Sequence, residues 1–263
     1  MTLALHHDTY PQTNTEEPSG DPMVILHGLF GSNSNWRSIA RRLSTNRAVT
    51  CLDLRNHGQS PWHDDMDYPS MASDVARFIE DHKLMNSILV GHSMGGKTVM
   101  SLLLDNLVPV SKSIIVDIAP VSYSHDHLEL LTAMKSMALN SAQNRDDIDK
   151  MLSAHIKDTA LRTFLLQNAV RDENGYRWRI NIESIYKNMS HLIDFQVRQR
   201  RSTTPTLFVA GGNSDYVLPK DHPQINAAFP CAQIEIVENA GHWLHAEKPS
   251  ALLNLITRLT SEA

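Results

Sequence analysis

Short apolar segments rich in β-branched residues alternate with segments of helical periodicity along most of the chain. The segments that predict strands cover residues 23–27, 48–54, 87–91, 113–118, 206–210 and 233–237. Several are apolar without interruption, which is typical of strands buried on both faces of a parallel sheet. Between them apolar residues recur at helical spacing, for example in a helix that we expect to begin at Ser70. The pattern predicts an α/β fold, a parallel sheet covered by helices.

The alternation stops between residues 121 and 201. This stretch is polar and charged, with helical patterns but no convincing strand. We therefore expect a core formed by residues 1–120 and 202–263, with residues 121–201 inserted as a helical cap, or lid, over the carboxyl ends of the strands, where ligands of open α/β sheets bind. Its apolar residues would pack the cap on itself, the commoner role, or line an acyl pocket; they are Leu130, Leu131, Met134 and Met137.

Composition narrows the class of protein. The chain has 263 residues, 41% of them hydrophobic and 20% charged, as in ordinary globular proteins. A net charge of −5 offers no basic surface for nucleic acid or anionic lipid. No apolar run approaches the roughly 18 residues of a membrane span, and the N-terminus does not resemble a signal peptide. We expect a soluble cytoplasmic monomer or homodimer whose partner is a small-molecule substrate.

A candidate nucleophile lies between a predicted strand and a predicted helix. Gly91, Ser93 and Gly95 form the pattern G-x-S-x-G directly after the strand of residues 87–91. At a sharp strand-to-helix turn this pattern exposes the serine hydroxyl, and the small flanking residues relieve crowding. The amides at the start of the following helix would face the reacting oxygen. The placement predicts Ser93 as the nucleophile of a hydrolase.

The same residues fit a second pattern. Gly91 to Thr98 also read G-x-x-x-x-G-K-T, the phosphate-binding loop of nucleotide-binding proteins. Asp117, at the end of the next apolar strand, would then bind magnesium. We keep a nucleotide-binding protein as an alternative. It is a remote one, because such a protein would not need the motifs described next.

The loop after the first predicted strand supplies a candidate oxyanion hole. His27 and Gly28 end that strand, and in hydrolases with this turn a second oxyanion donor comes from this loop. Gly28 allows close backbone approach, so the Leu29 amide, or less favourably that of Phe30, would act together with the Met94 amide. Two such donors stabilise the negative oxygen of a tetrahedral intermediate.

A serine hydroxyl needs a base, and His242 is the strongest candidate among 14 histidines. It follows a glycine after the last predicted strand and comes last in the chain order of nucleophile, acid and histidine. His245 is expected to support it or to lie at the surface. The pair His125 and His127 resembles a metal site only weakly, because zinc needs three or four ligands. We expect no metal and no cofactor.

Two aspartates qualify as the acid that orients the imidazole. Asp215 follows the strand of residues 206–210, and Asp117 ends the strand of residues 113–118. Both would lie at the carboxyl edge of the sheet, and the chain order suits either. The residue pattern alone slightly favours Asp215.

Taken together, the motifs resemble the bacterial YbfF-type esterases of the α/β-hydrolase fold. The resemblance covers nearly the whole chain and rests on six motifs in order, at residues 27–32, 53–60, 91–97, 116–120, 211–214 and 241–249. It implies a mostly parallel sheet of about eight strands, with the helical cap inserted after the sixth. It also implies a carboxylesterase acting on short- to medium-chain acyl esters, with acyl-CoA thioesters as further substrates.

The resemblance also bears on the acid. It implies that Asp117 completes the triad and that Ser214 lies near the histidine. The present chain departs from the family pattern by carrying Asp215 as well, so we take Asp117 as the preferred acid and Asp215 as the alternative. Other chemistries of the fold, including C–C bond hydrolysis, stay open because a fold does not decide a substrate. A non-catalytic binding protein is disfavoured, since every catalytic position is filled.

Overall fold

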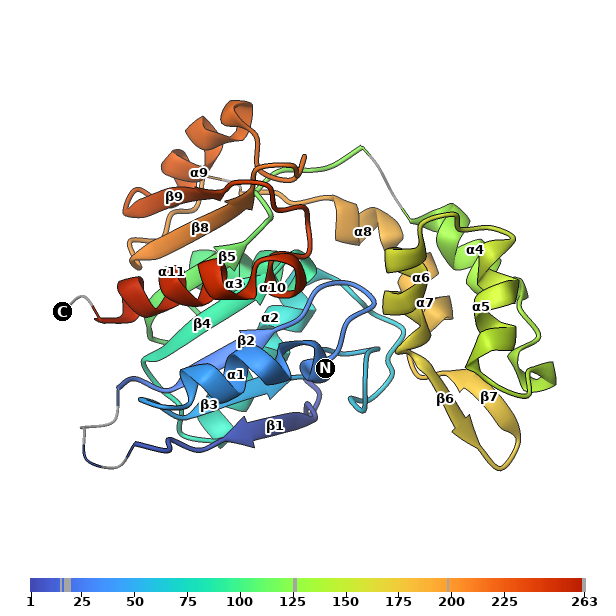
Figure 1. Ribbon diagram of the computed structural model, residues 1–263. Coiled ribbons are helices and arrows are strands. Elements are labelled where there is room, and N and C mark those ends of the chain that lie inside the picture. The colour runs from blue at the N-terminus through green and yellow to red at the C-terminus, as the bar shows by residue number, and fades with distance from the viewer. Residues whose placement is uncertain (15, 17–19, 125–126, 198, 262–263) are drawn as a thin grey trace.

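The apolar segments form a seven-stranded sheet in the computed structural model, which describes residues 1–14, 16, 20–124, 127–197 and 199–261 (Figure 1). The strands lie in the order β1-β3-β2-β4-β5-β8-β9. Only β1 runs antiparallel to its neighbour; the other pairs are parallel. Their bounds are β1 His7–Tyr10, β2 Met23–Leu26, β3 Val49–Leu52, β4 Ser87–His92, β5 Val110–Val116, β8 Thr206–Gly211 and β9 Ala232–Val237.

All six predicted strands are present, and the fold class is confirmed. The strand count differs from the expected eight, since the sheet has seven strands within the described residues, and the insertion follows the fifth strand, β5, instead of the sixth. The reason lies at the N-terminus. There the short strand β1 pairs directly with β3 at the edge of the sheet, and the described residues between β1 and β2 add no further strand.

Helices cover both faces of the sheet, and each face has its own hydrophobic core. Alternate residues of β2 point to opposite faces, as the period of a strand requires: Val24 packs with α2 and α3, whereas Ile25 packs with α1 and α11. The helix bounds are α1 Arg37–Leu43, α2 Tyr68–Asp81, α3 Met94–Leu104, α9 His222–Ala228, α10 Leu244–Glu247 and α11 Pro249–Ser261, with 3-10 turns η1 Asn33–Trp36 and η3 Pro219–Asp221.

Helix α2 begins earlier than the sequence predicted. Its N-cap is Asp67, whose side chain accepts a hydrogen bond from the Ser70 amide, and Pro69 occupies the first turn. An aspartate cap followed by proline is a strong start signal. Ser70 therefore lies inside the helix.

The insertion, residues 121–201, extends to one side of the sheet beyond the carboxyl ends of the strands (Figure 1). Its elements are α4 Leu128–Ser136, η2 Leu139–Ser141, α5 Arg145–Ser153, α6 Thr159–Leu166, β6 Ala169–Asp172, β7 Gly175–Trp178, α7 Ile182–Lys187 and α8 Met189–Ile193. The expectation of helices alone was wrong, because β6 and β7 form an antiparallel hairpin. The four-residue strands are too short to give a clear alternation, and Gly175, with φ at +104°, closes the turn.

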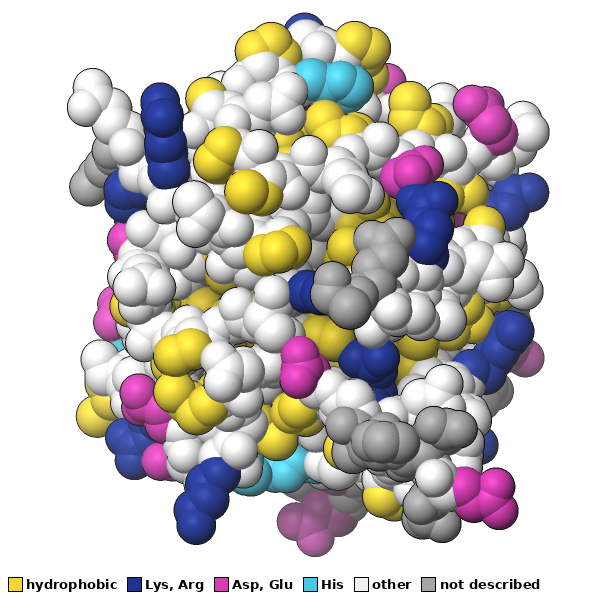
Figure 2. Space-filling view, turned by 90° about the vertical axis from the view of Figure 1, so that its left-hand side faces the viewer, with side chains coloured by type: hydrophobic (Ala, Val, Ile, Leu, Met, Phe, Trp, Pro, Cys, Tyr) yellow, Lys and Arg dark blue, Asp and Glu magenta, His cyan; other side chains and the backbone are white. Residues whose placement is uncertain are grey.

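The surface shows no dominance of one charge on the face seen in Figure 2, where Lys and Arg side chains are scattered among Asp and Glu. This agrees with the net charge of −5. In the part of the chain that the structure describes, no helix has the length and apolarity needed to cross a bilayer.

Candidate active site

Ser93 lies at the sharp turn between β4 and α3. Its backbone has φ 51° and ψ −116°, a conformation that L-residues rarely adopt, and its amide donates to the Val116 carbonyl at 3.0 Å. The flanking glycines are required for space. A Cβ at Gly91 would lie 2.4 Å from the Gly95 carbonyl oxygen, and one at Gly95 would lie 2.6 Å from that of His27. The turn therefore presents a half-buried serine at the carboxyl end of the sheet.

His242 and Asp117 meet beside this turn. His242 Nδ1 donates to Asp117 Oδ2 at 2.7 Å, and the carboxylate is fully buried. The same carboxylate accepts from the Gly211 amide at 2.8 Å and from the Ser214 hydroxyl. The backbone of His242 is held by His92, whose Nε2 donates to the His242 carbonyl at 2.8 Å. One carboxylate thus fixes which nitrogen of the ring carries a proton.

Asp215, the other candidate acid, lies apart from this arrangement. It is exposed, and the carboxylate that contacts His242 belongs to Asp117. The adjacent Tyr216 instead stacks on the His242 ring, with centroids 4.0 Å apart. The structure thus brings Asp117 and Ser214 to the histidine, while Asp215 faces solvent.

Hydrogen bonds in the loop after β2 hold the peptide unit between Gly28 and Leu29 in one orientation. Because the Gly28 carbonyl oxygen can only accept, His27 Nδ1 donates to it at 2.8 Å, and the Gly31 amide donates to it at 3.0 Å. A trans peptide unit directs its N–H opposite to its C=O, so the Leu29 amide points away from both donors. Within the described residues that amide makes no hydrogen bond.

The histidine behind this loop is neutral. The Leu54 amide donates to His27 Nε2 at 3.0 Å, so this nitrogen carries no proton. Complete burial lowers the pKa of His27 to about 4, which agrees with that tautomer. His57, with its ring centroid 5.1 Å from that of His27, accepts from the Phe30 amide at 3.1 Å. The Phe30 amide, the less favoured oxyanion donor, is therefore already occupied.

Met94 supplies the second amide near Ser93. As the first residue of α3, its N–H has no partner within the helix. Gly28 is needed for close approach here, since a Cβ would lie 2.8 Å from His92 Nδ1. The two predicted donors therefore belong to different elements: Leu29 to the loop after β2, and Met94 to the start of α3, directly after Ser93.

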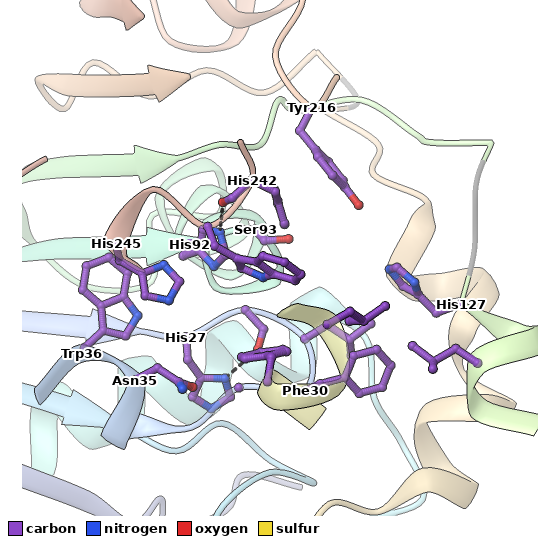
Figure 3. Close-up of a pocket in the computed structure, with 17 residues that line it drawn as sticks. His27, Phe30, Asn35, Trp36, His92, Ser93, His127, Tyr216, His242 and His245 are labelled. Carbon is purple, nitrogen blue, oxygen red and sulfur yellow. Dashed lines mark hydrogen bonds between the residues drawn. The ribbon is translucent and has the colours of Figure 1, made fainter. Parts of the chain in front are cut away.

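Two connected cavities meet at Ser93. The first, of about 590 Å³, is lined by His242, Trp243 and Phe30 and by Leu130 and Phe164 of the insertion (Figure 3). The second, of about 430 Å³, shares Leu29, Ser93, His127 and Tyr216 with the first and continues between Met94, Lys97, Ile118, Met189, Leu192 and Ile193.

Of the other apolar residues of the insertion that the sequence indicates, Leu131 and Met134 are buried in the core, and Met137 lines a different surface groove.

Lys97 lies at the base of the second cavity, four residues after the serine. Its side chain is buried, its Nζ donates to the Ile193 carbonyl at 3.1 Å, and it lies 4.7 Å from the centre of the Tyr123 ring. Burial lowers its pKa to about 7. In a phosphate-binding loop this lysine would face the ligand's phosphates; here it is packed between α3 and α8, so the nucleotide-binding alternative finds no support.

The weak metal hypothesis gains nothing from the geometry. His127 lines both cavities, whereas His125 lies outside the described residues. In the described ranges no three His, Cys, Asp or Glu side chains gather as metal ligands would. His245, expected as support or surface, is half-buried, stacks on the Trp36 ring with centroids 5.0 Å apart, and also lines the first cavity.

Two groups that touch the site were not singled out from the sequence. His57 lies inside the motif of residues 53–60, and Asn168 lies in the insertion. Asn168 Nδ2 donates to the Phe30 carbonyl at 2.7 Å across 138 residues of sequence. The position of His57 next to a glycine-containing turn is the only local feature of the sequence that could have indicated its role. No sequence pattern indicates a role for Asn168.

Comparisons with known proteins identify the family of the chain. A model of the alpha/beta hydrolase fold family matches residues 21–249. The sn-1-specific diacylglycerol lipase ABHD11 of Xenopus tropicalis is 39% identical over 256 residues, covering 93% of this chain and 79% of that protein. Esterase YbfF of Escherichia coli K12 is 34% identical, covering 95% of this chain and 97% of that protein, which confirms the resemblance seen in the motifs.

A solved structure extends the likeness to three dimensions. A marine microorganism esterase superposes with a TM-score of 0.90 at 39% identity, covering 98% of this chain and 99% of that one. With a matching family model over most of its length and relatives above 30% identity along nearly all of it, the chain belongs to the alpha/beta hydrolase fold family.

Proposed function

We propose that the chain is a serine esterase that hydrolyses carboxylic esters of short- to medium-chain acids through an acyl-enzyme. The observation that carries the proposal is the 2.7 Å hydrogen bond between His242 and the buried Asp117, formed beside a serine on a strained turn. Similarity to proteins named as an esterase and a diacylglycerol lipase supports an ester substrate.

In the first half-reaction, the Ser93 hydroxyl oxygen attacks the ester carbonyl carbon while His242 Nε2 takes the hydroxyl proton. The carbonyl oxygen becomes negative and accepts hydrogen bonds from the Leu29 and Met94 amides. Asp117 stabilises the imidazolium without taking its proton. Collapse of the intermediate breaks the bond to the alcohol, which leaves with the proton from His242.

In the second half-reaction, water replaces the alcohol. His242 takes a proton from the water as its oxygen attacks the acyl carbon, and the same two amides hold the new oxyanion. Collapse returns the proton to Ser93 and releases the carboxylic acid. His242 accepts and then returns each proton that is transferred. The overall reaction converts an ester and water into a carboxylic acid and an alcohol.

We further propose that the insertion serves as the cap of this enzyme. Leu130, Leu161 and Phe164 supply part of the wall of the first cavity, and Met189 and Leu192 supply part of the second. Apolar walls on both sides suit an acyl chain and an alcohol of modest size.

The test is hydrolysis of p-nitrophenyl esters from acetate to palmitate by the wild-type chain and by Ser93→Ala. We expect turnover that is highest for short to medium chains and falls to background in the variant. Intact folding of the variant is checked by its circular dichroism and melting temperature. Absence of turnover on every ester and on the matching acyl-CoA thioesters, or undiminished turnover by Ser93→Ala, would overturn the proposal.

A further inference from the structure

Phe30 is an unusual residue to find beside the proposed oxyanion hole. Its φ is +61°, the left-handed region that glycine adopts freely and that a bulky residue adopts only when its surroundings hold it there. It directly follows Leu29 and lies on the wall of the first cavity (Figure 3). A relaxation of Phe30 toward an ordinary conformation would turn the preceding peptide units, including the Leu29 amide.

One side of Phe30 is held by His57. The Phe30 amide donates to His57 Nε2 at 3.1 Å, and His57 Nδ1 donates to the Arg55 carbonyl at 3.0 Å. Full burial lowers the pKa of His57 to about 3, so the ring stays neutral and keeps an acceptor for the amide. This contact comes from the core.

The other side of Phe30 is held by the insertion. Asn168 Nδ2 donates to the Phe30 carbonyl at 2.7 Å, and the Asn168 side chain is buried. The backbone of Asn168 is itself fixed, because its carbonyl accepts from the Arg179 amide at 2.9 Å. Arg179 in turn reaches the same loop, donating to the Ser32 hydroxyl at 2.9 Å.

We propose that Asn168 is a positioning residue of the esterase: together with His57 on the opposite side, it clamps Phe30 in its left-handed conformation and so aims the Leu29 amide at the oxyanion. The inference rests on the proposed function, because an aimed amide matters only if an oxyanion forms there. The insertion then takes part in catalysis itself, through one buried amide group, in addition to lining the cavity.

The neighbouring Gln167 separates this role from simple attachment of the insertion. Its side-chain oxygen accepts from Asn35 Nδ2 at 2.7 Å, so it also joins the insertion to the loop, but it is exposed and its hydrogen bond goes to Asn35 and not to Phe30. If the contacts serve only to attach the insertion, both residues should matter alike. If Asn168 aims the oxyanion hole, only its loss should slow the chemical step.

The experiment measures kcat and KM for a p-nitrophenyl ester in Asn168→Asp, Asn168→Ala and Gln167→Ala. Asn168→Asp keeps the side-chain shape but removes the donor, and Asn168→Ala removes the side chain. We expect kcat to fall about 10- to 100-fold in both, since misplacing a donor costs up to what deleting one does. KM should change less than about threefold, because the contact acts on the transition state. Gln167→Ala should keep kcat within about twofold.

A second readout follows the oxyanion directly. A trifluoromethyl ketone forms a tetrahedral adduct with the serine, so its inhibition constant should rise in the Asn168 variants in proportion to their loss in kcat/KM. Hydrogen exchange of the peptide covering residues 28–33 should speed up in the same variants. Should the Asn168 variants not fold, His57→Leu replaces them, with His57→Gln as the conservative variant expected to retain most of kcat.

The outcomes distinguish the two proposals. An active wild type with unchanged kcat in Asn168→Asp, or with equal losses in Asn168→Ala and Gln167→Ala, overturns the positioning role and leaves the esterase intact. A loss confined to KM also overturns it. A wild type that hydrolyses no ester overturns the proposed function and the positioning role together, whatever the exchange rates show.

Discussion

At the scale of single residues, the buried carboxylate of Asp117 is the most constrained group of the site. It accepts three hydrogen bonds, from His242, Ser214 and the Gly211 amide, in a region that water does not reach. Its own φ of +51° shows that the backbone is bent to bring it there. A carboxylate so fully satisfied is suited to hold an imidazole in one orientation and to stabilise its charged form.

Asp117→Asn is expected to lower kcat by about 10³- to 10⁴-fold, because an amide would favour the wrong tautomer of His242. Asp215→Asn should stay within about threefold of the wild type, since Asp215 is exposed. Steady-state kinetics on one p-nitrophenyl ester measure both, with melting temperatures as the check on folding. Similar, mild losses in the two variants would contradict a single dominant acid.

Some residues of the candidate site can be predicted from the sequence, and others cannot. Ser93, Gly28 and His242 lie in motifs whose spacing reflects a local turn, so pattern and chemistry agree within a few residues. The choice between Asp117 and Asp215 depends on which strand end reaches the imidazole, and that depends on loop paths that no local pattern encodes. The Phe30 clamp joins groups 27 and 138 residues apart, so it exists only once the chain has folded.

At the scale of elements, α3 and α8 are joined by the buried side chain of Lys97. Lys97, on the first turns of α3, donates to the carbonyl of Ile193, the last residue of α8. A cation at a helix C-terminus is favourable, and the ring of Tyr123 lies 4.7 Å from the ammonium. Desolvation outweighs the neighbouring Asp194, so the pKa of Lys97 falls to about 7.

This shift predicts a pH dependence of stability. The folded-state pKa lies below the unfolded value of 10.5, so between about pH 7 and 10.5 the unfolded chain holds a proton that the folded chain releases. The free energy of unfolding therefore gains a contribution as the pH rises through this window. Lys97→Met has no titrating group at this position and lacks this contribution. The difference in free energy of unfolding, wild type minus variant, should therefore increase by about 2–3 kcal/mol from pH 7 to 9.5.

Urea unfolding of both chains at pH 7.0, 8.0 and 9.5 measures this difference. The upper limit avoids the range in which unfolded tyrosines lose their protons. A parallel pH profile in the two chains would show that Lys97 is charged in the folded state throughout, and that its desolvation is offset by its contacts. The comparison needs no knowledge of the substrate.

The helices and strands that the sequence predicts correctly are those with a clear pattern of apolar residues. The sequence predicts β2, β3, β4, β5, β8 and the second edge strand β9 from their apolar or β-branched residues. It does not predict β1, whose four partly exposed residues lie at the opposite edge of the sheet. The hairpin β6–β7 escaped for the same reason. The predicted start of α2 was wrong because two residues that can cap a helix, Asp67 and Ser70, lie within one turn of each other. Pro69 in the first turn favours Asp67 as the cap.

At the scale of the whole molecule, the two cavities divide the proposed substrate between them. His242 lines the first cavity and not the second. The group that protonates the leaving alcohol must lie on the alcohol's side of the reacting carbon. The alcohol therefore belongs in the first cavity, and the acyl chain in the second, where Met94, Ile118, Met189 and Leu192 offer apolar contact. Core and insertion each supply part of both walls.

This division predicts how chain-length preference responds to filling one cavity. Met189 is buried on the wall of the second cavity, so Met189→Phe should shorten it. We expect kcat/KM for p-nitrophenyl octanoate relative to acetate to fall by about tenfold or more, because displacing a methylene costs about 1–3 kcal/mol of selective binding. The matched control is Leu161→Phe, which fills the first cavity and should leave that ratio unchanged. A lower ratio in Leu161→Phe, with Met189→Phe unaffected, would place the acyl chain on the side of His242 and reverse the assignment of the two cavities.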